Sequence, residues 1–116
     1  MAYEDAVIVV TSAARTTTGN SGALVSPKAL NLGLSVEVTA SSGTTPSLVA
    51  SVEWSMDGVN FCAADTTADA FAAITTSPVR VARAFTVKAP FYRVVWTLTG
   101  TTPSFTFSCS RYGVGR

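Results

Sequence analysis

The sequence predicts an all-β protein that folds as a single-domain antiparallel β-sandwich, jelly-roll or Ig-like, with eight to nine strands. Three observations support this fold class. Apolar and polar residues alternate with a period of two in several segments, no segment sustains a helical period of about 3.6, and glycines and prolines divide the chain at short intervals. The 116 residues are enough to bury one continuous core.

The composition also favours strands and indicates no charged partner. Charged residues make up 13% of the chain, against roughly 25% in an average globular protein. Thr and Val, which are abundant here, are β-branched and suit a pleated sheet. The formal net charge is +1, so we expect neither nucleic acid nor a membrane among the partners.

The first predicted strand is the apolar run from Ala6 to Thr11. Because neither of its faces is polar, this strand is either covered on both faces or paired with a neighbouring subunit. The segment from Arg15 to Gly22 is rich in turn formers and predicts a loop or an extended arm. We therefore expect residues 1–27 to form an N-terminal strand and arm, and residues 28–112 to form the sandwich core of the same domain.

Four further segments alternate clearly between apolar and polar residues. In each of them we expect the apolar side chains to face the core, because successive side chains of a strand point to opposite faces. The inward sets are Leu30, Leu32, Leu34, Val36 and Val38; Leu48, Ala50, Val52 and Trp54; Tyr92, Val94, Trp96 and Leu98; and Phe105, Phe107 and Cys109.

The pentapeptide Gly-Thr-Thr-Pro-Ser occurs twice, at Gly43 to Ser47 and at Gly100 to Ser104. Each copy lies between two alternating segments. Glycine tolerates positive φ and proline lacks the N–H that a central ladder needs, so we expect each copy to be a turn that reverses the chain into a hairpin. Either similar turn chemistry arose twice, or a strand-turn-strand unit was duplicated.

The dipeptide Asp57-Gly58 predicts a two-residue hairpin turn. Such a turn would place Trp54 opposite Phe61 and would direct Cys62 to the other face of the sheet. Cys109 has the inward parity of the last segment. We therefore expect two free thiols on different faces.

The segment between the predicted hairpin and Val79 is expected to be a loop with a short strand, over residues 63–77. Alternation resumes at Val79, but Arg83 then occupies an apolar position of the pattern. This conflict predicts either a β-bulge near residues 82–84 or a buried partner for Arg83, such as Asp65 or Asp69.

The chain lacks the residues that most catalytic sites require. It contains no histidine, which excludes His-dependent triads and nearly all zinc sites. Lys28 and Lys88 lie near no recognisable nucleophile motif, and no phosphate-binding glycine loop is present. Asp65 and Asp69 form a carboxylate pair of a kind common in solvated loops. We therefore expect no enzyme activity, no catalytic residue, no cofactor and no metal.

Five segments spread along the chain carry a resemblance to known proteins. They are Thr18 to Leu24, Val36 to Leu48, Trp54 to Gly58, Tyr92 to Trp96, and Gly100 to Ser108. Together they resemble small all-β virion proteins of tailed bacteriophages, of the capsid decoration or head-associated type. The resemblance implies a β-sandwich that binds the outer capsid surface and stabilises contacts between capsomers. No functional residue is carried over with it.

The same resemblance implies the partners and the location of the protein. The expected partners are the major capsid protein and sister subunits in a homo-oligomer, such as a trimer. The expected location is the virion after synthesis in the host cytoplasm, since Glu4 and Asp5 stand where a secretory signal carries basic residues. No apolar run reaches the length of a transmembrane helix. Two alternatives are a neck or tail protein of the virion and a carbohydrate-binding module that stacks host sugars on exposed aromatic rings.

The N-terminal segment is the expected contact with a partner, because its apolar strand has no obvious place in the core. The candidate contact residues are Ala6, Val7, Ile8, Val9, Val10, Arg15 and Asn20.

Overall fold

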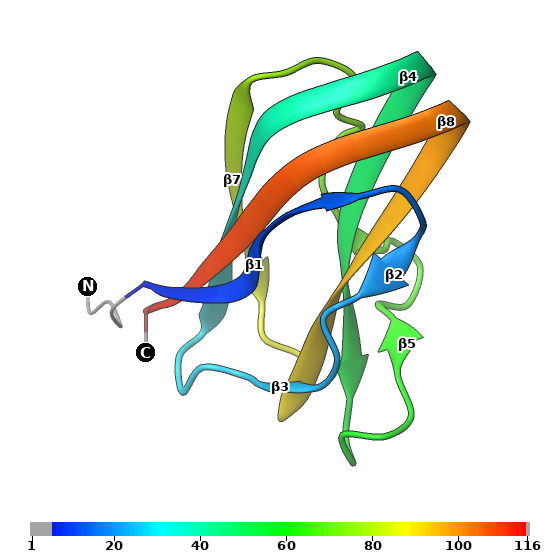
Figure 1. Cartoon of the computed structure of the whole chain (residues 1–116). Coiled ribbons are helices and arrows are strands. Elements are labelled where there is room, and N and C mark those ends of the chain that lie inside the picture. The colour runs from blue at the N-terminus through cyan, green and yellow to red at the C-terminus, as the bar shows by residue number, and fades with distance from the viewer. Residues whose placement is uncertain (1–5, 116) are drawn as a thin grey trace.

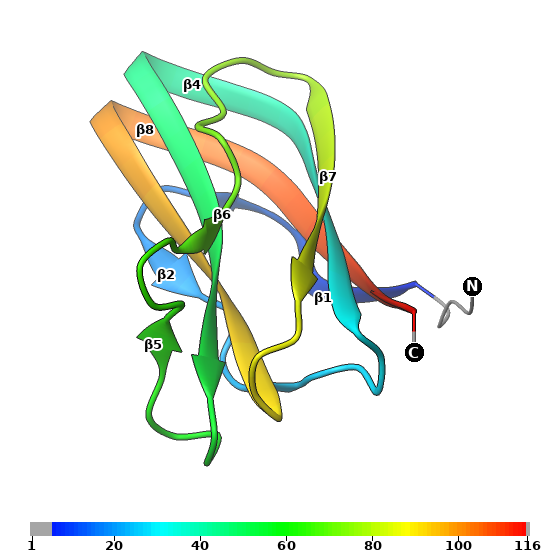
Figure 2. The same cartoon turned by 180° about the vertical axis from the view of Figure 1, so that it is seen from behind.

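The computed structural model describes residues 6–115, with Val114 described by its backbone alone. These residues form eight strands and no helix, which confirms the all-β class. The strands, drawn in Figures 1 and 2, are β1 (Val7–Arg15), β2 (Gly19–Asn20), β3 (Leu24–Val25), β4 (Asn31–Ser55), β5 (Cys62–Ala63), β6 (Asp69–Ala70), β7 (Val79–Thr86) and β8 (Phe91–Val114).

Two long strands, β4 and β8, organise the fold. They pair antiparallel with each other along their whole length, from Asn31 opposite Val114 to Ser55 opposite Phe91. Both strands bend near their midpoints, at the corner seen at the upper right of Figure 1. The first half of β4 therefore pairs with the second half of β8, and the second half of β4 with the first half of β8.

The bend folds this ribbon into two layers. The first layer runs from β1 through the second half of β8 and the first half of β4 to β7. The second layer places β2 and β3 beside the first half of β8, and β5 and β6 beside the second half of β4. Aromatic rings pack edge to face between the layers, with centroids 5.5 Å apart for Trp96 and Phe107 and 5.7 Å apart for Phe71 and Phe85. The chain is a single-domain antiparallel β-sandwich, as predicted.

The core lies between these layers and contains nearly all of the predicted inward side chains. Exceptions are Leu30, which is exposed just before β4, and Leu98, which is half-buried near the corner. The buried apolar residues are Val10, Leu32, Leu34, Val36, Val38, Leu48, Ala50, Val52, Trp54, Phe71, Ile74, Phe85, Tyr92, Val94, Trp96, Phe105, Phe107 and Cys109. The prediction of a loop with a short strand over residues 63–77 is confirmed: this segment contains β6 and a bridge that pairs Ile74 with Leu48.

The prediction that each Gly-Thr-Thr-Pro-Ser copy forms a hairpin is wrong. The arms on either side of a copy do not pair with each other, because each continues as one bent strand paired with the strand of the other copy. Gly43 and Gly100 both have a φ of 115°, while Thr45 and Thr102 have φ values of 47° and 46°. A Cβ added at Gly43 would lie 2.7 Å from the carbonyl oxygen of Thr102, and one added at Gly100 would lie 2.7 Å from that of Thr45. The two pentapeptides therefore form one shared corner.

The strand pairing repeats between the two halves of the chain. In the first half, β1 pairs with the second half of β8, and β2 and β3 with its first half. In the second half, β5 and β6 pair with the second half of β4, and β7 with its first half. Each of these ladders, like that between β4 and β8, joins a strand of residues 7–55 to a strand of residues 62–114. This repetition supports a duplicated unit, but the two units interlock instead of forming separate hairpins.

Both predictions for Arg83 are wrong. Strand β7 pairs with β4 in unbroken register, so no bulge forms at residues 82–84. Asp69 pairs with Lys88, and Arg83 is exposed, with its guanidinium carbon 5.8 Å from the centroid of the Phe85 ring. Because β7 is an edge strand, solvent reaches an inward-parity side chain that a central strand would bury.

Tyr92 places a polar atom without a partner in the core. Its side chain is fully buried, and its hydroxyl makes no hydrogen bond within the part of the chain that the structure describes. Burial raises the pKa of Tyr92 to about 12, and it also raises the pKa of the buried Cys109 thiol to about 12. Such a hydroxyl costs on the order of 1–3 kcal/mol in lost hydration.

Tyr92→Phe should therefore increase the free energy of unfolding by about 0.5–1 kcal/mol at neutral pH, measured by urea unfolding. The raised folded-state pKa also predicts a dependence on alkaline pH. Below the ordinary pKa of 10.0 the phenol is neutral in both the folded and the unfolded state, and stability does not depend on its ionisation. As the pH rises from this value towards about 12, the phenol ionises more readily in the unfolded state, and the free energy of unfolding falls. The Phe variant should lose less stability over this interval. If Tyr92→Phe were instead less stable than the wild type at neutral pH, this would contradict the finding that the Tyr92 hydroxyl makes no hydrogen bond within residues 6–115.

Candidate binding site

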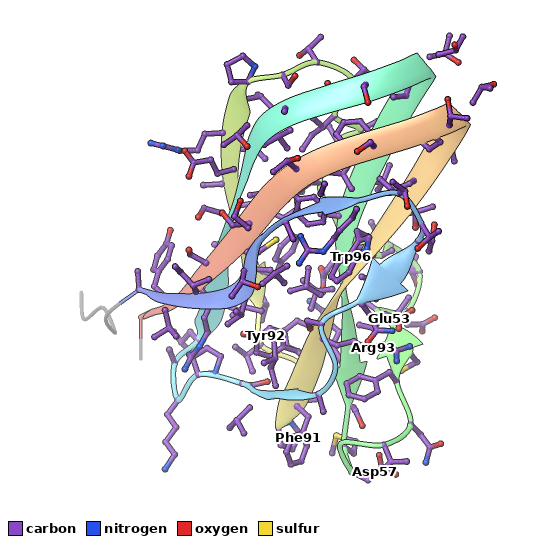
Figure 3. All side chains as sticks on the ribbon, viewed as in Figure 1. Glu53, Asp57, Phe91, Tyr92, Arg93 and Trp96 are labelled. Carbon is purple, nitrogen blue, oxygen red and sulfur yellow. The ribbon has the colours of Figure 1, made fainter. Side chains whose placement is uncertain are left out.

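The loop of residues 56–61, between β4 and β5, is organised by the carboxylate of Asp57 (Figure 3). Its Oδ1 accepts hydrogen bonds of 2.9 Å from the Ser55 hydroxyl and from the backbone amides of Val59 and Asn60. Its Oδ2 accepts a further bond of 2.9 Å from Nδ2 of Asn60. The Ser55 hydroxyl in turn accepts from the amides of Asp57 and Gly58. These bonds give an exposed loop a defined shape.

The predicted two-residue turn is thus wrong, because these side-chain bonds stabilise a longer loop. The register places Trp54 opposite Cys62 and not opposite Phe61. Cys62 consequently lies on the side of Trp54, where it is exposed at the end of the sandwich, while Cys109 is buried in the core. Both thiols are free, as predicted. The prediction that they point to different faces is wrong, because Cys62 shares the inward side of Trp54 and Cys109 also points into the core.

The same hydrogen bonds predict an acid-resistant loop. The backbone amides of Asn60 and Val59, followed by the side chains of Asn60 and Ser55, hold the pKa of Asp57 well below its ordinary value of 3.8. The stabilisation from the carboxylate is present above that ordinary pKa and is lost as the pH falls through the lower folded-state pKa. NMR titration should find the amide shifts of Val59 and Asn60 unchanged at pH 4, with a midpoint well below it. A midpoint near 4 would contradict these contacts, and Asp57→Asn, which has no carboxylate at this position, serves as the control.

A pocket of about 430 Å³ lies between this loop, β5 and the segment before β8. Its lining is mainly apolar, with Trp54 at the end of β4 and Lys88 beside it. The lining residues are Trp54, Ser55, Met56, Asp57, Asn60, Cys62, Ala63, Ala64, Asp65, Lys88 and Ala89. No local sequence pattern predicted this site, because Lys88 is distant along the chain from Trp54. The Asp57-Gly58 dipeptide is the one sequence signal within the pocket.

Asp69 fixes the side chains of Trp54 and Lys88 at one side of the pocket. Oδ2 of Asp69 accepts hydrogen bonds of 2.8 Å from Nε1 of Trp54 and 2.8 Å from Nζ of Lys88. The Lys88 ammonium lies 5.5 Å from the centroid of the Trp54 ring, and it also donates to the carbonyl of Thr86. These contacts position the Trp54 ring and neutralise Lys88 locally.

The outer face of the second layer carries another charged pair close to the same loop. Arg93 donates to Oε1 of Glu53 through Nε at 2.8 Å and through Nη2 at 2.6 Å, and its guanidinium carbon lies 4.6 Å from the centroid of the Phe61 ring. Figure 3 shows this pair above Asp57 and Phe91. Arg80 likewise pairs with Glu37. Together with Lys88 and its partner Asp69, three basic side chains in the described part of the chain are thus paired with carboxylates.

The expected partner-contact residues fall into an exposed group and an internal group. Ala6, Val7, Ile8 and Asn20 are exposed, Val9 is half-buried against the core, and Val10 is buried in it. Arg15 is half-buried, with its guanidinium carbon 4.9 Å and 4.7 Å from the ring centroids of Trp96 and Phe107. It donates to the carbonyls of Thr11, Ala13 and Phe107.

Strand β1 is an edge strand of the first layer and is not covered on both faces. It pairs with β8 on one side, with register shifts between Ile8 and Val10 and between Val10 and Ala13. Val7 and Ile8 are 48% and 63% exposed, so of the two alternatives for this strand, coverage of both faces by this chain is wrong and pairing with a neighbouring subunit stays a prediction. The described part of residues 1–27 lies along β8, as Figure 1 shows.

Both tryptophans are buried, so neither ring presents a free face for sugar stacking. Within residues 6–115, no three His, Cys, Asp or Glu side chains converge on a position that could hold a metal ion. The same residues contain no helix long and apolar enough to cross a membrane.

Comparison with known proteins adds no relative: no family model, no curated protein and no solved structure matches this chain.

Proposed function

We propose that the protein is a non-enzymatic structural protein of a tailed-phage virion, most specifically a decoration protein that binds the outer capsid surface and stabilises contacts between capsomers. The observation that carries this proposal is the β1 edge, where Val7 and Ile8 are 48% and 63% exposed on a strand paired on one side only. Edge strands offer unpaired backbone groups to a neighbouring chain, and exposed apolar side chains on such an edge favour association. The resemblance of the sequence to phage virion proteins supports the same function.

The proposed partners are the major capsid protein and sister copies of this chain. A protein that joins capsomers needs two contact surfaces. The β1 edge and the pocket beside β5 lie at opposite ends of the strand order β1-β8-β4-β5. This separation supports a bridging role, in which each surface contacts a different neighbour.

The test is binding of the purified protein to capsids that lack it, followed by co-sedimentation. The double variant Val7→Ser, Ile8→Ser should lose about tenfold or more in affinity, because it removes apolar surface from the contact. Val25→Ser is the control, since Val25 is likewise an exposed apolar residue, at 66%, but lies on β3 in the second layer. Wild-type binding by the double variant would refute the β1 contact, and failure of the wild-type protein to bind would refute the decoration function.

A further inference from the structure

We propose that the pocket between β4, β5 and Lys88 is a docking site for a basic side chain, lysine or arginine, presented by a partner protein. The inference rests on the proposed structural function, because it assigns the chemistry of a partner contact. The occupant follows from the shape of the pocket, its apolar lining and the charges around it.

The size and lining of the pocket suit a long side chain with an apolar stem. Its volume of about 430 Å³ exceeds what one such side chain fills, so the partner backbone can approach the rim. Met56, which is 76% exposed, and alanines from β5 and the segment before β8 line the walls. The methylene groups of lysine or arginine bury well against such walls while the head group stays polar.

The charges at the rim favour a cation. The carboxylates of Asp57 and Asp65 line the pocket, and within the described residues neither forms an ion pair with lysine or arginine. Lys88, the one basic residue of the lining, is already paired with Asp69. The pocket thus carries two carboxylates without a basic partner among residues 6–115 beside one ion pair, and this excess of negative charge attracts a positive and repels a negative occupant.

The loop bonds keep this charge in place before any partner arrives. Asp57 accepts four hydrogen bonds, one from Ser55 at the end of β4 and three from Val59 and Asn60 in the loop, so its carboxylate is held in one position. Asp65 accepts one bond of 2.9 Å from the Thr66 amide through Oδ1. A partner cation would therefore meet a prearranged site and would not have to order it.

The exposed thiol of Cys62, which lines the pocket, allows a direct measurement of this field. Its rates of modification by a cationic reagent, aminoethyl methanethiosulfonate, and by an anionic one, sulfonatoethyl methanethiosulfonate, are compared at low ionic strength. Both rates are normalised to those of N-acetylcysteine amide. The cationic reagent should gain roughly 3- to 10-fold over the anionic one. Cys109 is buried and should not contribute.

Two variants link the rate ratio to the pocket. Asp65→Asn keeps the acceptor for the Thr66 amide but removes one charge, so the ratio should fall by about half or more. Glu37→Gln removes one carboxylate from the first layer, away from the pocket, and should leave the ratio unchanged. An equal or inverted ratio in the wild type, or a ratio unaffected by Asp65→Asn, would overturn the proposal.

A competition experiment tests the apolar part of the site. Butylguanidinium, which joins an arginine head group to an apolar stem, should slow the reaction of Cys62 with the neutral reagent methyl methanethiosulfonate, whereas butyl sulfate should not. Equal protection by both probes, or by neither, would overturn the assignment of a basic occupant. These measurements use the isolated protein, so they stand even where capsid binding fails. In particles that do contain the protein, Cys62 should be protected, and an equally reactive Cys62 would overturn docking by a partner.

Discussion

Gly43→Ala is expected to destabilise the protein by about 3 kcal/mol or more, a large part of the total stability of a small domain. The φ of Gly43 is 115°, a conformation that residues with a Cβ rarely adopt. The added Cβ would also lie 2.7 Å from the carbonyl oxygen of Thr102 and 2.9 Å from Cα of Pro103. Both are backbone atoms held in the facing strand, so the corner cannot relax by moving a flexible side chain.

Urea unfolding of three variants measures this effect. Gly100→Ala should cost as much as Gly43→Ala, because its Cβ would lie 2.7 Å from the carbonyl oxygen of Thr45. Gly22→Ala is the matched control, since Gly22 also has a positive φ, of 80°, but has nothing within 4 Å of an added Cβ. It should cost about 1 kcal/mol, from the left-handed conformation alone. Equal losses at Gly22 and Gly43 would contradict the close approach of the two pentapeptides.

Neither half of the chain is expected to fold alone, but the two halves are expected to fold when mixed. The reason is that each described ladder joins residues 7–55 to residues 62–114. A fragment of residues 1–58 would contain β1 to β4 with no pairing among them, and a fragment of residues 59–116 would contain β5 to β8 with none either. Each fragment would expose its half of the core, whereas the mixture can restore all of the ladders.

Near-ultraviolet circular dichroism of separate and mixed fragments tests this expectation. The separate fragments should lack the signal of packed tryptophan, and an equimolar mixture should recover it as a one-to-one complex. Cutting instead between Val36 and Glu37 is the control, because it severs β4 where both residues pair with β7 and with β8, and it should give a much weaker complex. A folded isolated half would contradict the interlocked arrangement.

Local patterns in the sequence predicted the core-facing side chains well. Alternation with a period of two depends only on which face of a strand is buried, and it correctly placed inward side chains such as Leu34, Val52 and Val94. The same reasoning could not identify pairing partners. The Gly-Thr-Thr-Pro-Ser copies carry the residue types of a turn, but whether the adjoining strands pair with each other or with the other copy depends on residues far along the chain.

The pocket was less predictable than the core for the same reason. Trp54 and Asp57 are close in sequence, but Lys88 reaches Trp54 only through the folded arrangement and its bond to Asp69. Asp57-Gly58 indicated a turn at the correct place, yet the hydrogen bonds to Ser55 and Asn60 lengthened it and changed the register of Cys62. The contact of Arg15 with a partner stays a prediction, whereas its packing against the rings of Trp96 and Phe107 could not be predicted from the sequence, because both rings lie far along the chain.

Counting the copies of this protein in purified virions by quantitative mass spectrometry tests the central claim most directly. A protein that covers the capsid surface is repeated with the capsomers, so we expect hundreds of copies per particle. A neck or tail location at a unique vertex would give about a dozen copies or fewer, set by the ring symmetry there. Such a low count would contradict the decoration function, and the absence of the protein from purified particles would contradict any structural role in the virion.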